Sequence, residues 1–335
     1  MNALMESLYQ GNHLDSEQTS DMIRRIVEGE LSEAEISALL VALKIKGESA
    51  EEIAGAASAL RASATPFARP SDLVVDTCGT GGDGLGTINI STIVGLVAAE
   101  CGVKVAKHGN RSVSSKSGSS DVLQRLGVKL DASPQIAAKS LEQLNFCFLF
   151  APMYHPGVKH VMPVRTALKT RTLFNLIGPL ANPALPDVQL MGVYDPNLLV
   201  TMAEALQRLG CQKAFVVNGG GLDEMALHTE TKVAYLNEGS IEQLTIAPEQ
   251  AGLDRVDLRE LQMDDPVEIA AALLCVLKGH GKKAHIDAIA FNTAAVLFLT
   301  DKVKTLKSGV DMAKEVIASG RVAERLEAIV EMSHG

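Results

Sequence analysis

Glycine is concentrated in the stretch DTCGTGGDGLGTINIST, residues 76–92, where five of the eight residues at 79–86 are glycines. Glycine loses more backbone freedom on folding than other residues, so this run indicates either a flexible linker or a backbone that approaches a ligand closely. An expected strand at 72–76 precedes the run, and an expected helix follows it from about Asn89 or Ser91. In open α/β sheets, ligands bind where strands lead into helix N-termini, whose free N–H groups attract anions. The stretch therefore predicts a phosphate site.

Two familiar phosphate-binding motifs do not explain this run. Gly79, Gly81 and Gly84 match G-x-G-x-x-G loosely, but Asp83 would then face a dinucleotide pyrophosphate. A P-loop needs Gly-Lys-Ser/Thr, which the chain lacks. A tight glycine turn without chemistry is the alternative. We favour it less, because hydroxyl and amide side chains gather at the start of the same helix.

A second polar segment, KHGNRSVSSKSGSSD at 107–121, also follows an expected strand. It combines serine hydroxyls with four basic side chains, those of Lys107, His108, Arg111 and Lys116. On a chain with a net charge of -9, this is a local site of attraction for anions. A polar surface loop is the alternative. Two such loops at strand ends of one sheet favour a shared polyanion pocket.

The third segment, NGGGLDEMALH at 218–228, places Asp223 and Glu224 after another strand and another glycine run. Two carboxylates beside a phosphate would repel it unless a hard cation lies between them, and Mg²⁺ bridges carboxylates to substrate phosphates. A solvated acidic turn would carry no function. Together with two phosphate loops, the pair predicts a magnesium site.

The composition of the 335-residue chain limits its possible partners. The net charge of -9 argues against broad binding to nucleic acid or to an anionic membrane. The sequence shows no apolar run long enough for a membrane span and no signal peptide. Five cysteines, odd in number and never in a C-x-x-C pair, indicate reduced thiols in the cytoplasm and no zinc site.

The order of expected elements predicts the fold class. The first sixty or so residues look helical, with S-x-x-E capping boxes at Ser32 and Ser49, and prolines at 66–70 suggest a domain boundary. Short strands then alternate with helices, which implies a mainly parallel sheet covered on both faces; we expect them at 72–76, 103–109, 146–152, 190–195 and 213–219. We therefore expect an α/β protein with a small N-terminal helical domain, 1–70, and a larger α/β domain, 71–335.

In these three segments and over nearly the whole chain, the sequence resembles the anthranilate phosphoribosyltransferase family, a nucleoside phosphorylase/phosphoribosyltransferase-like family. The 107–121 segment is specific, whereas GTGGD alone is shared with pyrimidine nucleoside phosphorylases. Further matching segments are HPGVKHVMPVRTALKTRTLFNLIGPLANP at 155–183, GGLDE at 220–224 and FNTAAVL at 291–297.

The resemblance implies a fold, an activity and partners. Helices from about 160–185 would join the N-terminal helical domain, and the α/β domain would be the catalytic domain that binds phosphoribosyl pyrophosphate (PRPP). The implied enzyme is a Mg²⁺-dependent glycosyltransferase (pentosyltransferase) of L-tryptophan biosynthesis. It would transfer the phosphoribosyl group of PRPP to the amino group of anthranilate and release pyrophosphate. The family implies a cytoplasmic homodimer that packs through the helical domain, with no nucleic-acid or membrane partner.

The resemblance also implies site residues. Ser91, Asp223 and Glu224 would be the Mg²⁺ ligands, and Gly79, Asn110, His155, Arg165 and Pro179 would contact anthranilate. Lys107, His108 and Arg165 would act by positioning or electrostatics, and no acid or base is assigned. The residues expected to hold PRPP are Gly79, Gly82, Asp83, Thr87, Asn89, Ile90, Ser91, Thr92, Lys107, His108, Gly109, Asn110, Arg111, Ser112, Val113, Ser114, Ser115 and Ser119.

One residue departs from the family pattern, since many relatives have glycine where Lys169 stands, in the turn before Arg171. Two competing functions stay open. A pyrimidine nucleoside phosphorylase would also act at ribose C1. The Asp223–Glu224 pair, which suits a metal-bound pyrophosphate, and Asn110 with Arg165, which suit a carboxylate, both favour the transferase. A binding protein that kept the fold and lost activity is the non-enzymatic alternative, which the intact loops and the net charge argue against.

Overall fold

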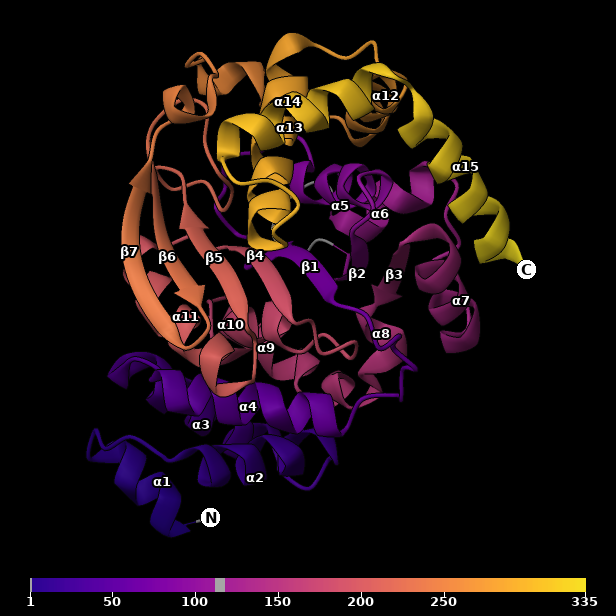
Figure 1. Cartoon of the computed structure of the whole chain (residues 1–335). Helices are drawn as coiled ribbons and strands as arrows, with labels where there is room; N and C mark the ends of the chain where they lie inside the picture. The colour runs from indigo at the N-terminus through magenta and orange to yellow at the C-terminus, as the bar shows by residue number, and fades with distance from the viewer. Residues whose placement is uncertain (1, 112–117) are drawn as a thin grey trace.

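The computed structural model describes residues 2–111 and 118–335. The chain begins with four helices that lie at the bottom of Figure 1, and a seven-stranded sheet lies above them. Capping boxes at Asp15, Ser32 and Ser49 set the starts of the second, third and fourth helices. These four helices are α1 (Asn2–Tyr9), α2 (Ser16–Val27), α3 (Glu33–Lys46) and α4 (Ala50–Ala62).

The sheet has the order β3-β2-β1-β4-β5-β6-β7. The five strands from β3 to β5 are parallel, and β6 and β7 add an antiparallel hairpin at one edge. The strands are β1 (Val74–Gly79), β2 (Lys104–Gly109), β3 (Phe146–Phe150), β4 (Val188–Gly192), β5 (Lys213–Asn218), β6 (Thr231–Asn237) and β7 (Ser240–Ile246). The expected fold class, a helical part and a larger part with a mainly parallel sheet, is confirmed.

The sequence analysis did not predict the β6–β7 hairpin. Its strands are joined by Glu238 and Gly239, both with positive φ (46° and 90°), as a two-residue hairpin turn requires. Most of β7 is exposed and polar, so it lacks the apolar signal of a buried strand. The N-E-G-S turn between alternating residues was the available signal.

Both faces of the parallel part of the sheet, from β3 to β5, are largely buried. In β5, Phe215 and Val217 belong to one apolar core, and Ala214 and Val216 belong to the other, as the two-residue period of a strand requires. The first core contains residues of α5 (Ile90–Glu100), α6 (Ser119–Arg125), α12 (Pro266–Leu277), α13 (Lys283–Leu299), α14 (Leu306–Ala318) and α15 (Arg321–His334). The second contains residues of α2, α3 and α4 together with α9 (Met162–Leu168), α10 (Leu173–Ile177) and α11 (Leu199–Arg208).

A smaller third core packs α7 (Pro134–Leu144) on β2 and β3. The remaining short elements are α8 (Ala151–Tyr154) and five 3₁₀ turns: η1 (Pro156–His160), η2 (Gly178–Leu180), η3 (Pro196–Leu198), η4 (Pro248–Ala251) and η5 (Leu258–Glu260).

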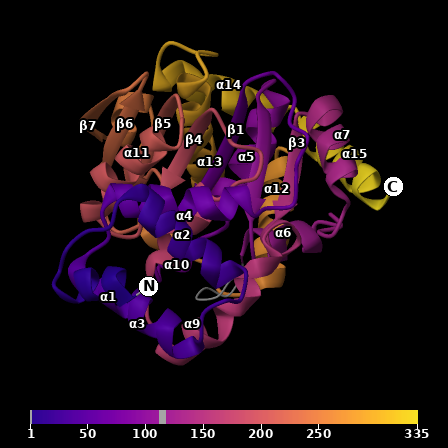
Figure 2. The ribbon, with the colours of Figure 1, turned by 90° about the horizontal axis from the view of Figure 1, so that it is seen from below.

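The segment from α8 to η2 returns to the N-terminal helices. Phe174 and Ile177 of α10 share a core with Ile23 of α2 and Leu40 of α3. Figure 2 shows α9 and α3 grouped with α1 at one end of the molecule. This return packs α9 against α3, and α10 against α3 and α4.

A buried carboxylate fixes the N-terminal helices. Glu52 has no exposed surface and accepts hydrogen bonds from Leu14 N (2.9 Å), Ser49 N (2.8 Å) and Lys46 Nζ (2.7 Å). A buried charge is tolerated only when it is paired and hydrogen-bonded, so these donors define where the α1–α2 connection meets the end of α3 and the start of α4.

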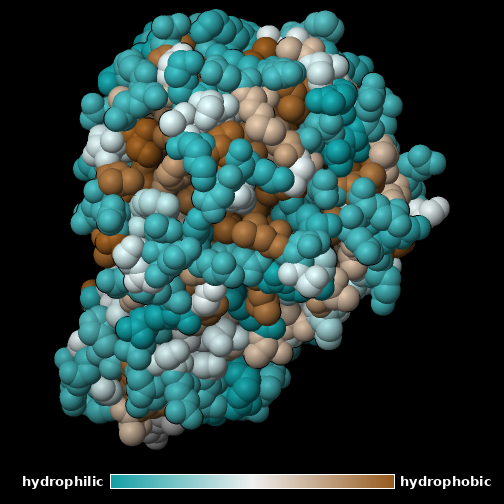
Figure 3. Space-filling model, in the orientation of Figure 1, coloured by the Kyte–Doolittle hydropathy of each residue, from teal (hydrophilic) through white to brown (hydrophobic). Residues whose placement is uncertain are grey.

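Hydrophilic side chains dominate the face in Figure 3, interrupted by small apolar areas. No helix in the described part of the chain is both long enough and apolar enough to cross a membrane.

Candidate functional site

Asp223, in the loop after β5, lies against the ends of two other strands. A Cβ on Gly79, the last residue of β1, would lie 2.4 Å from Asp223 Oδ2, and a Cβ on Gly192, the last residue of β4, would lie 1.6 Å from Asp223 O. Only glycine permits these approaches. Gly81 N donates to Asp223 Oδ2 over 2.8 Å. The glycine loop after β1 and the acidic loop after β5 therefore meet.

The neighbouring carboxylate is held by the start of α5. Ser91 N donates to Glu224 Oε1 over 3.1 Å, as expected of a free N–H at a helix N-terminus. Lys107 Nζ, from β2, donates to Ser91 Oγ over 3.3 Å and also to Thr77 O. The Lys107 side chain is buried, so its charge acts in a low-dielectric environment. Three predicted residues, Ser91, Lys107 and Glu224, thus lie together.

The acidic groups of this cluster repel one another. Burial, reinforced by the charge of Asp83, raises the pKa of Asp223 to about 7. Burial and the charge of Asp223 raise the pKa of Glu224 well above its ordinary value. Burial lowers the pKa of the Lys107 ammonium, and the carboxylate of Asp76 opposes this most strongly. Carboxylates in this state favour a cation beside them.

The described residues include no group of three or more His, Cys, Asp or Glu side chains arranged to hold a metal ion. Asp223 and Glu224 supply hard oxygen donors, which suit Mg²⁺. Mg²⁺ commonly binds through one or two carboxylates plus substrate phosphates and water, so this pair fits a magnesium ion that arrives with a polyphosphate.

The glycine loop is also held from the opposite side. Thr87 forms an antiparallel bridge with Gln262, and Met263 N donates to Gly86 O over 2.9 Å. Within the loop, Asp83 Oδ1 accepts from Leu85 N over 3.1 Å. The loop is thus an ordered strand-to-helix connection between β1 and α5.

The loop after β2 is described only at its ends. A Cβ on Gly109 would lie 2.2 Å from Ser119 Oγ, so Ser119 lies at the end of β2. Asn110 is exposed, and its Oδ1 accepts from Arg111 N over 2.7 Å. The Arg111 guanidinium pairs with Asp121 at 3.1 Å. Ser112, Val113, Ser114 and Ser115 lie outside the described residues.

Two histidines pack together under the end of β2. The rings of His108 and His155 are edge to face, with centroids 5.2 Å apart, and both side chains are buried. Burial and the neighbouring His155 lower the pKa of His108 to about 3. Burial also lowers the pKa of His155. Both imidazoles are therefore neutral at physiological pH.

Arg165 lies on α9, half-buried, with its guanidinium carbon 5.9 Å from the centroid of the Phe174 ring. Burial lowers the pKa of Arg165. No carboxylate among the described residues forms an ion pair with it, so its planar donors are available to an anionic ligand. Pro179 is buried, and its carbonyl accepts from Gln189 Nε2 over 2.8 Å.

Asp76 is a buried residue that the sequence analysis did not assign. Its carboxylate accepts from His108 N (3.3 Å) and from Asn182 Nδ2 (2.8 Å), and Asn182 Nδ2 also donates to Ala106 O (2.8 Å). Burial raises the pKa of Asp76 to about 6. The sequence did contain a signal for such a role, because Asp76 is a charged residue in a strand that otherwise consists of apolar and small residues. This contact fixes the segment around Pro179 against β2.

Lys169, where many relatives were expected to have glycine, has a left-handed conformation (φ 48°) at the end of α9. Glycine adopts this conformation without steric cost, which explains the preference for it there. The lysine keeps the turn, because Lys169 N still donates to Arg165 O over 3.3 Å.

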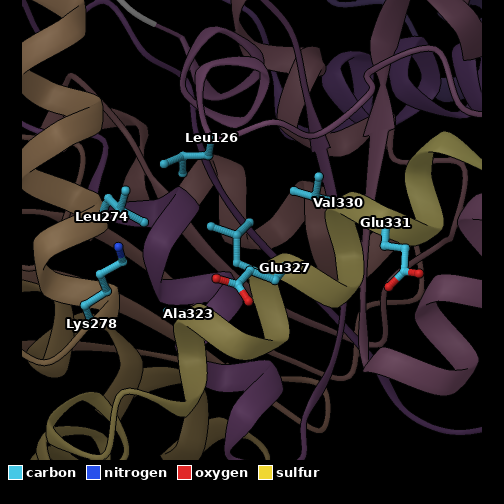
Figure 4. Close-up of a pocket in the computed structure, with 8 residues that line it drawn as sticks. Leu126, Leu274, Lys278, Ala323, Glu327, Val330 and Glu331 are labelled. Carbon is cyan, nitrogen blue, oxygen red and sulfur yellow. The ribbon is translucent and has the colours of Figure 1, made fainter.

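An apolar hollow of about 340 Å³ lies apart from these loops, between α6, α12 and α15. Figure 4 shows Leu126, Leu274 and Val330 around it, with Lys278, Glu327 and Glu331 nearby. None of the predicted site residues lines this hollow.

Comparison with known proteins gives a consistent result. Residues 71–323 match the model of the glycosyl transferase family a/b domain, and residues 2–64 match the model of the helical bundle domain of the same family. Anthranilate phosphoribosyltransferase of Sorangium cellulosum is 50% identical over 99% of this chain and 96% of that relative. The enzyme of Aeromonas hydrophila with the same name is 52% identical over 98% and 96%.

Solved structures agree. The crystal structure of anthranilate phosphoribosyltransferase from Thermus thermophilus superposes with a TM-score of 0.94, at 42% identity and 99% coverage of both chains. Anthranilate phosphoribosyltransferase from Saccharomyces cerevisiae in complex with PRPP and Mg gives a TM-score of 0.90 at 28% identity, covering 98% of this chain and 96% of that one.

The neutral His108 predicts a measurable dependence of stability on pH. Its pKa is about 3 in the folded chain against an ordinary 6.5. Between these values the unfolded chain takes up a proton that the folded chain does not, so stability falls as the pH falls. Relative to His108→Phe, the wild-type free energy of unfolding should drop by about 2 kcal/mol more between pH 6.5 and 4.5. Urea unfolding at the two pH values measures this difference. Equal pH dependence of both proteins would contradict a neutral, buried His108.

Proposed function

Since the chain belongs to the anthranilate phosphoribosyltransferase family, we propose how its own residues carry out the transfer that defines the family. The enzyme transfers the phosphoribosyl group of PRPP to the amino group of anthranilate, releases pyrophosphate, and acts in L-tryptophan biosynthesis. One observation carries the assignment of the donor site. Asp223 and Glu224 accept hydrogen bonds from the backbone of the glycine loop and of the α5 start, at Gly81 and Ser91.

Ser91, Asp223 and Glu224 are proposed to hold Mg²⁺ with PRPP. Two observations support this metal site: the raised pKa values of Asp223 and Glu224, and the hydrogen bond from Ser91 N to Glu224. When bound, Mg²⁺ neutralises negative charge on the diphosphate. The pyrophosphate is then a better leaving group.

The loops after β1 and β2 are proposed to hold the rest of PRPP. The expected residues are those at 79–92 and 107–115 named above, with Ser119. Lys107 supplies a buried positive charge beside Ser91 and Glu224, where electrostatic stabilisation is strong. Backbone N–H groups at glycines approach anions without steric hindrance from a Cβ.

The transfer needs no strong base in this arrangement. Breaking the bond between C1 of the ribose and pyrophosphate leaves positive charge on the sugar and negative charge on the leaving group. The amino group of anthranilate is uncharged at neutral pH, so its lone pair forms the C1–N bond as the bond from C1 to the pyrophosphate oxygen breaks. The nitrogen is then positively charged and acidic, and it loses one proton to the released pyrophosphate or to water. His108 has a strongly lowered pKa and is proposed to position its neighbours, not to remove a proton. The catalytic requirement is therefore placement and charge.

The acceptor side is proposed to be formed by Gly79, Asn110, His155, Arg165 and Pro179. Arg165 is proposed to bind the carboxylate of anthranilate through two parallel N–H donors. Its partial burial and its lack of an ion-pair partner among the described residues support this role. The His108–His155 contact links this side to the end of β2.

We also propose the domain division and a homodimer. Residues 1–70, joined by helices from about 160–185, would form the helical domain, and residues 71–335 the catalytic domain. The exposed apolar side chains of Tyr9 (58%), Ile45 (81%) and Met162 (38%) on α1, α3 and α9 support an interface there. A cytoplasmic location is supported by five cysteines that are all free.

The central experiment follows the fluorescence of anthranilate after PRPP and Mg²⁺ are added. The signal should decay with wild-type protein and should not decay without PRPP. Glu224→Gln should lower kcat by about 100-fold and weaken the dependence on Mg²⁺, because one oxygen charge at the metal is lost. Glu230→Gln removes the same charge from an exposed residue of the same loop and serves as the matched control. No decay with folded wild-type protein would contradict the function, and equal Mg²⁺ titrations of both variants would contradict the metal site.

Replacement of Arg165 tests the acceptor site. Arg165→Ala should raise KM for anthranilate by about 10- to 100-fold, the loss expected for a charge-assisted pair, with little change in KM for PRPP. Arg208→Ala, which removes an exposed arginine of α11, is the control. An unchanged KM for anthranilate would reject the role of Arg165.

The interface is tested by sedimentation. Ile45→Glu should shift a wild-type dimer towards monomer, because a charge would be buried at the contact. Val267→Glu changes a comparably exposed residue (61%) on α12 and should not shift it. A monomeric wild-type protein, or a dimer that tolerates Ile45→Glu, would contradict an interface at this face.

A further inference from the structure

Arg171 joins the glycine loop to the helices beneath it. Its Nη2 donates to Gly82 O, in the loop proposed to hold PRPP. Its guanidinium carbon lies 3.8 Å from the centroid of the Tyr194 ring. Its own backbone carbonyl accepts from Lys44 Nζ of α3 over 2.9 Å. One residue therefore touches the donor loop, the segment after β4 and the N-terminal helices.

Tyr194, which carries the ring under the Arg171 guanidinium, also contacts the start of the glycine loop. Tyr194 N donates to Thr80 Oγ1 over 3.2 Å, and Thr80 N donates to Gly192 O over 2.9 Å. A guanidinium on an aromatic face gains cation–π attraction, which holds the Arg171 side chain in one orientation. Arg171 thus contacts the loop directly, by its hydrogen bond to Gly82 O, and indirectly, through Tyr194, which binds Thr80.

The peptide of Gly82, whose carbonyl Arg171 binds, lies next to the residues that contact the Asp223 carboxylate. Gly82 has φ of 75° and is flanked by Gly81, whose N–H binds Asp223, and by Asp83, whose charge raises the pKa of Asp223. Glycines at 81 and 82 leave the backbone free to rotate unless something external fixes it. Within the described residues, Arg171 is the side chain that binds the Gly82 carbonyl.

The segment that carries Arg171 also carries the acceptor contact. Arg165 lies six residues earlier, on α9, and the left-handed turn at Lys169 lies between them. Thr172 then begins α10, which packs in the core of the helical layer. Arg171 therefore lies between the segment of α9 and α10 and the glycine loop, and contacts that loop at Gly82.

We propose that Arg171 is a positioning residue for the transfer reaction: it orders the glycine loop for PRPP and couples that loop to the acceptor segment that bears Arg165. This inference rests on the proposed donor and acceptor sites. It assigns no contact between Arg171 and substrate. The residue acts through the Gly82 carbonyl and the Tyr194 ring.

The test begins with the kinetics of Arg171→Ala, measured in the full chain with PRPP and Mg²⁺. KM for PRPP should rise about tenfold and kcat should fall, because the loop is no longer held in its binding conformation. Arg208→Ala is again the matched control, since it also removes an exposed arginine. Lys44→Met removes only the donor to the Arg171 carbonyl and should raise KM for PRPP in the same direction by a smaller factor.

Arg171→Lys separates positioning from simple attraction of phosphate. Lysine keeps the charge but loses the planar fork and the stacking, so it should restore only part of the affinity for PRPP. Full restoration by lysine would overturn positioning in favour of charge alone. Tyr194→Leu should raise KM for PRPP as well, and Arg171→Ala combined with Tyr194→Leu should be less than multiplicative, as expected for one contact.

Failure of the transfer activity and failure of the role of Arg171 give different results. An inactive, folded wild-type protein would contradict the transfer itself and the inference with it. An active wild-type protein with unchanged KM for PRPP in Arg171→Ala and Lys44→Met would overturn only the role of Arg171. If Arg171→Ala does not fold, the Lys44→Met and Arg171→Lys variants decide by the same criteria.

Discussion

The site depends on two carboxylates held against backbone N–H groups. Both residues belong to the loop after β5. Asp223 packs against the glycine loop, where Gly79 and Gly192 leave room for it, and Glu224 packs against the first turn of α5 at Ser91. Without a Cβ at those two glycines the loops come into contact, and with one they could not. This packing concentrates negative charge at the edge of the sheet where strands end. The same geometry suits a ligand that arrives with a hard cation, as proposed above.

The buried polar groups around these two carboxylates make different contacts. Lys107 brings a positive charge to Ser91, while Asp76 holds the His108 backbone and, through Asn182, the segment next to Pro179. Buried polar groups are costly unless they are satisfied, so this network specifies one arrangement of β1, β2 and the acceptor segment. The neutral His108–His155 pair adds an apolar-like ring contact between β2 and the segment before α9.

The proposed donor and acceptor sites lie in different layers of the fold. The donor loops leave the sheet, whereas Arg165 comes from α9, which packs with the N-terminal helices. The reaction requires C1 of the ribose and the amino group of anthranilate to meet at van der Waals distance. Contacts that cross between the layers are therefore candidates for positioning residues, and Arg171 makes such a contact through Gly82 and Lys44.

The sequence alone determined the fold class and the three loops, because strand and helix periods, capping boxes and the glycine run are local patterns. It also predicted Asp223 and Glu224 as a metal pair, since adjacent carboxylates after a strand need only local context. It did not predict the β6–β7 hairpin, whose outer strand is polar and exposed. Only the tertiary structure decided the roles of Asp76 and Arg171. Their partners lie between 23 residues (Arg171 and Tyr194) and 127 residues (Arg171 and Lys44) away in the chain, and no local pattern encodes contacts at that separation.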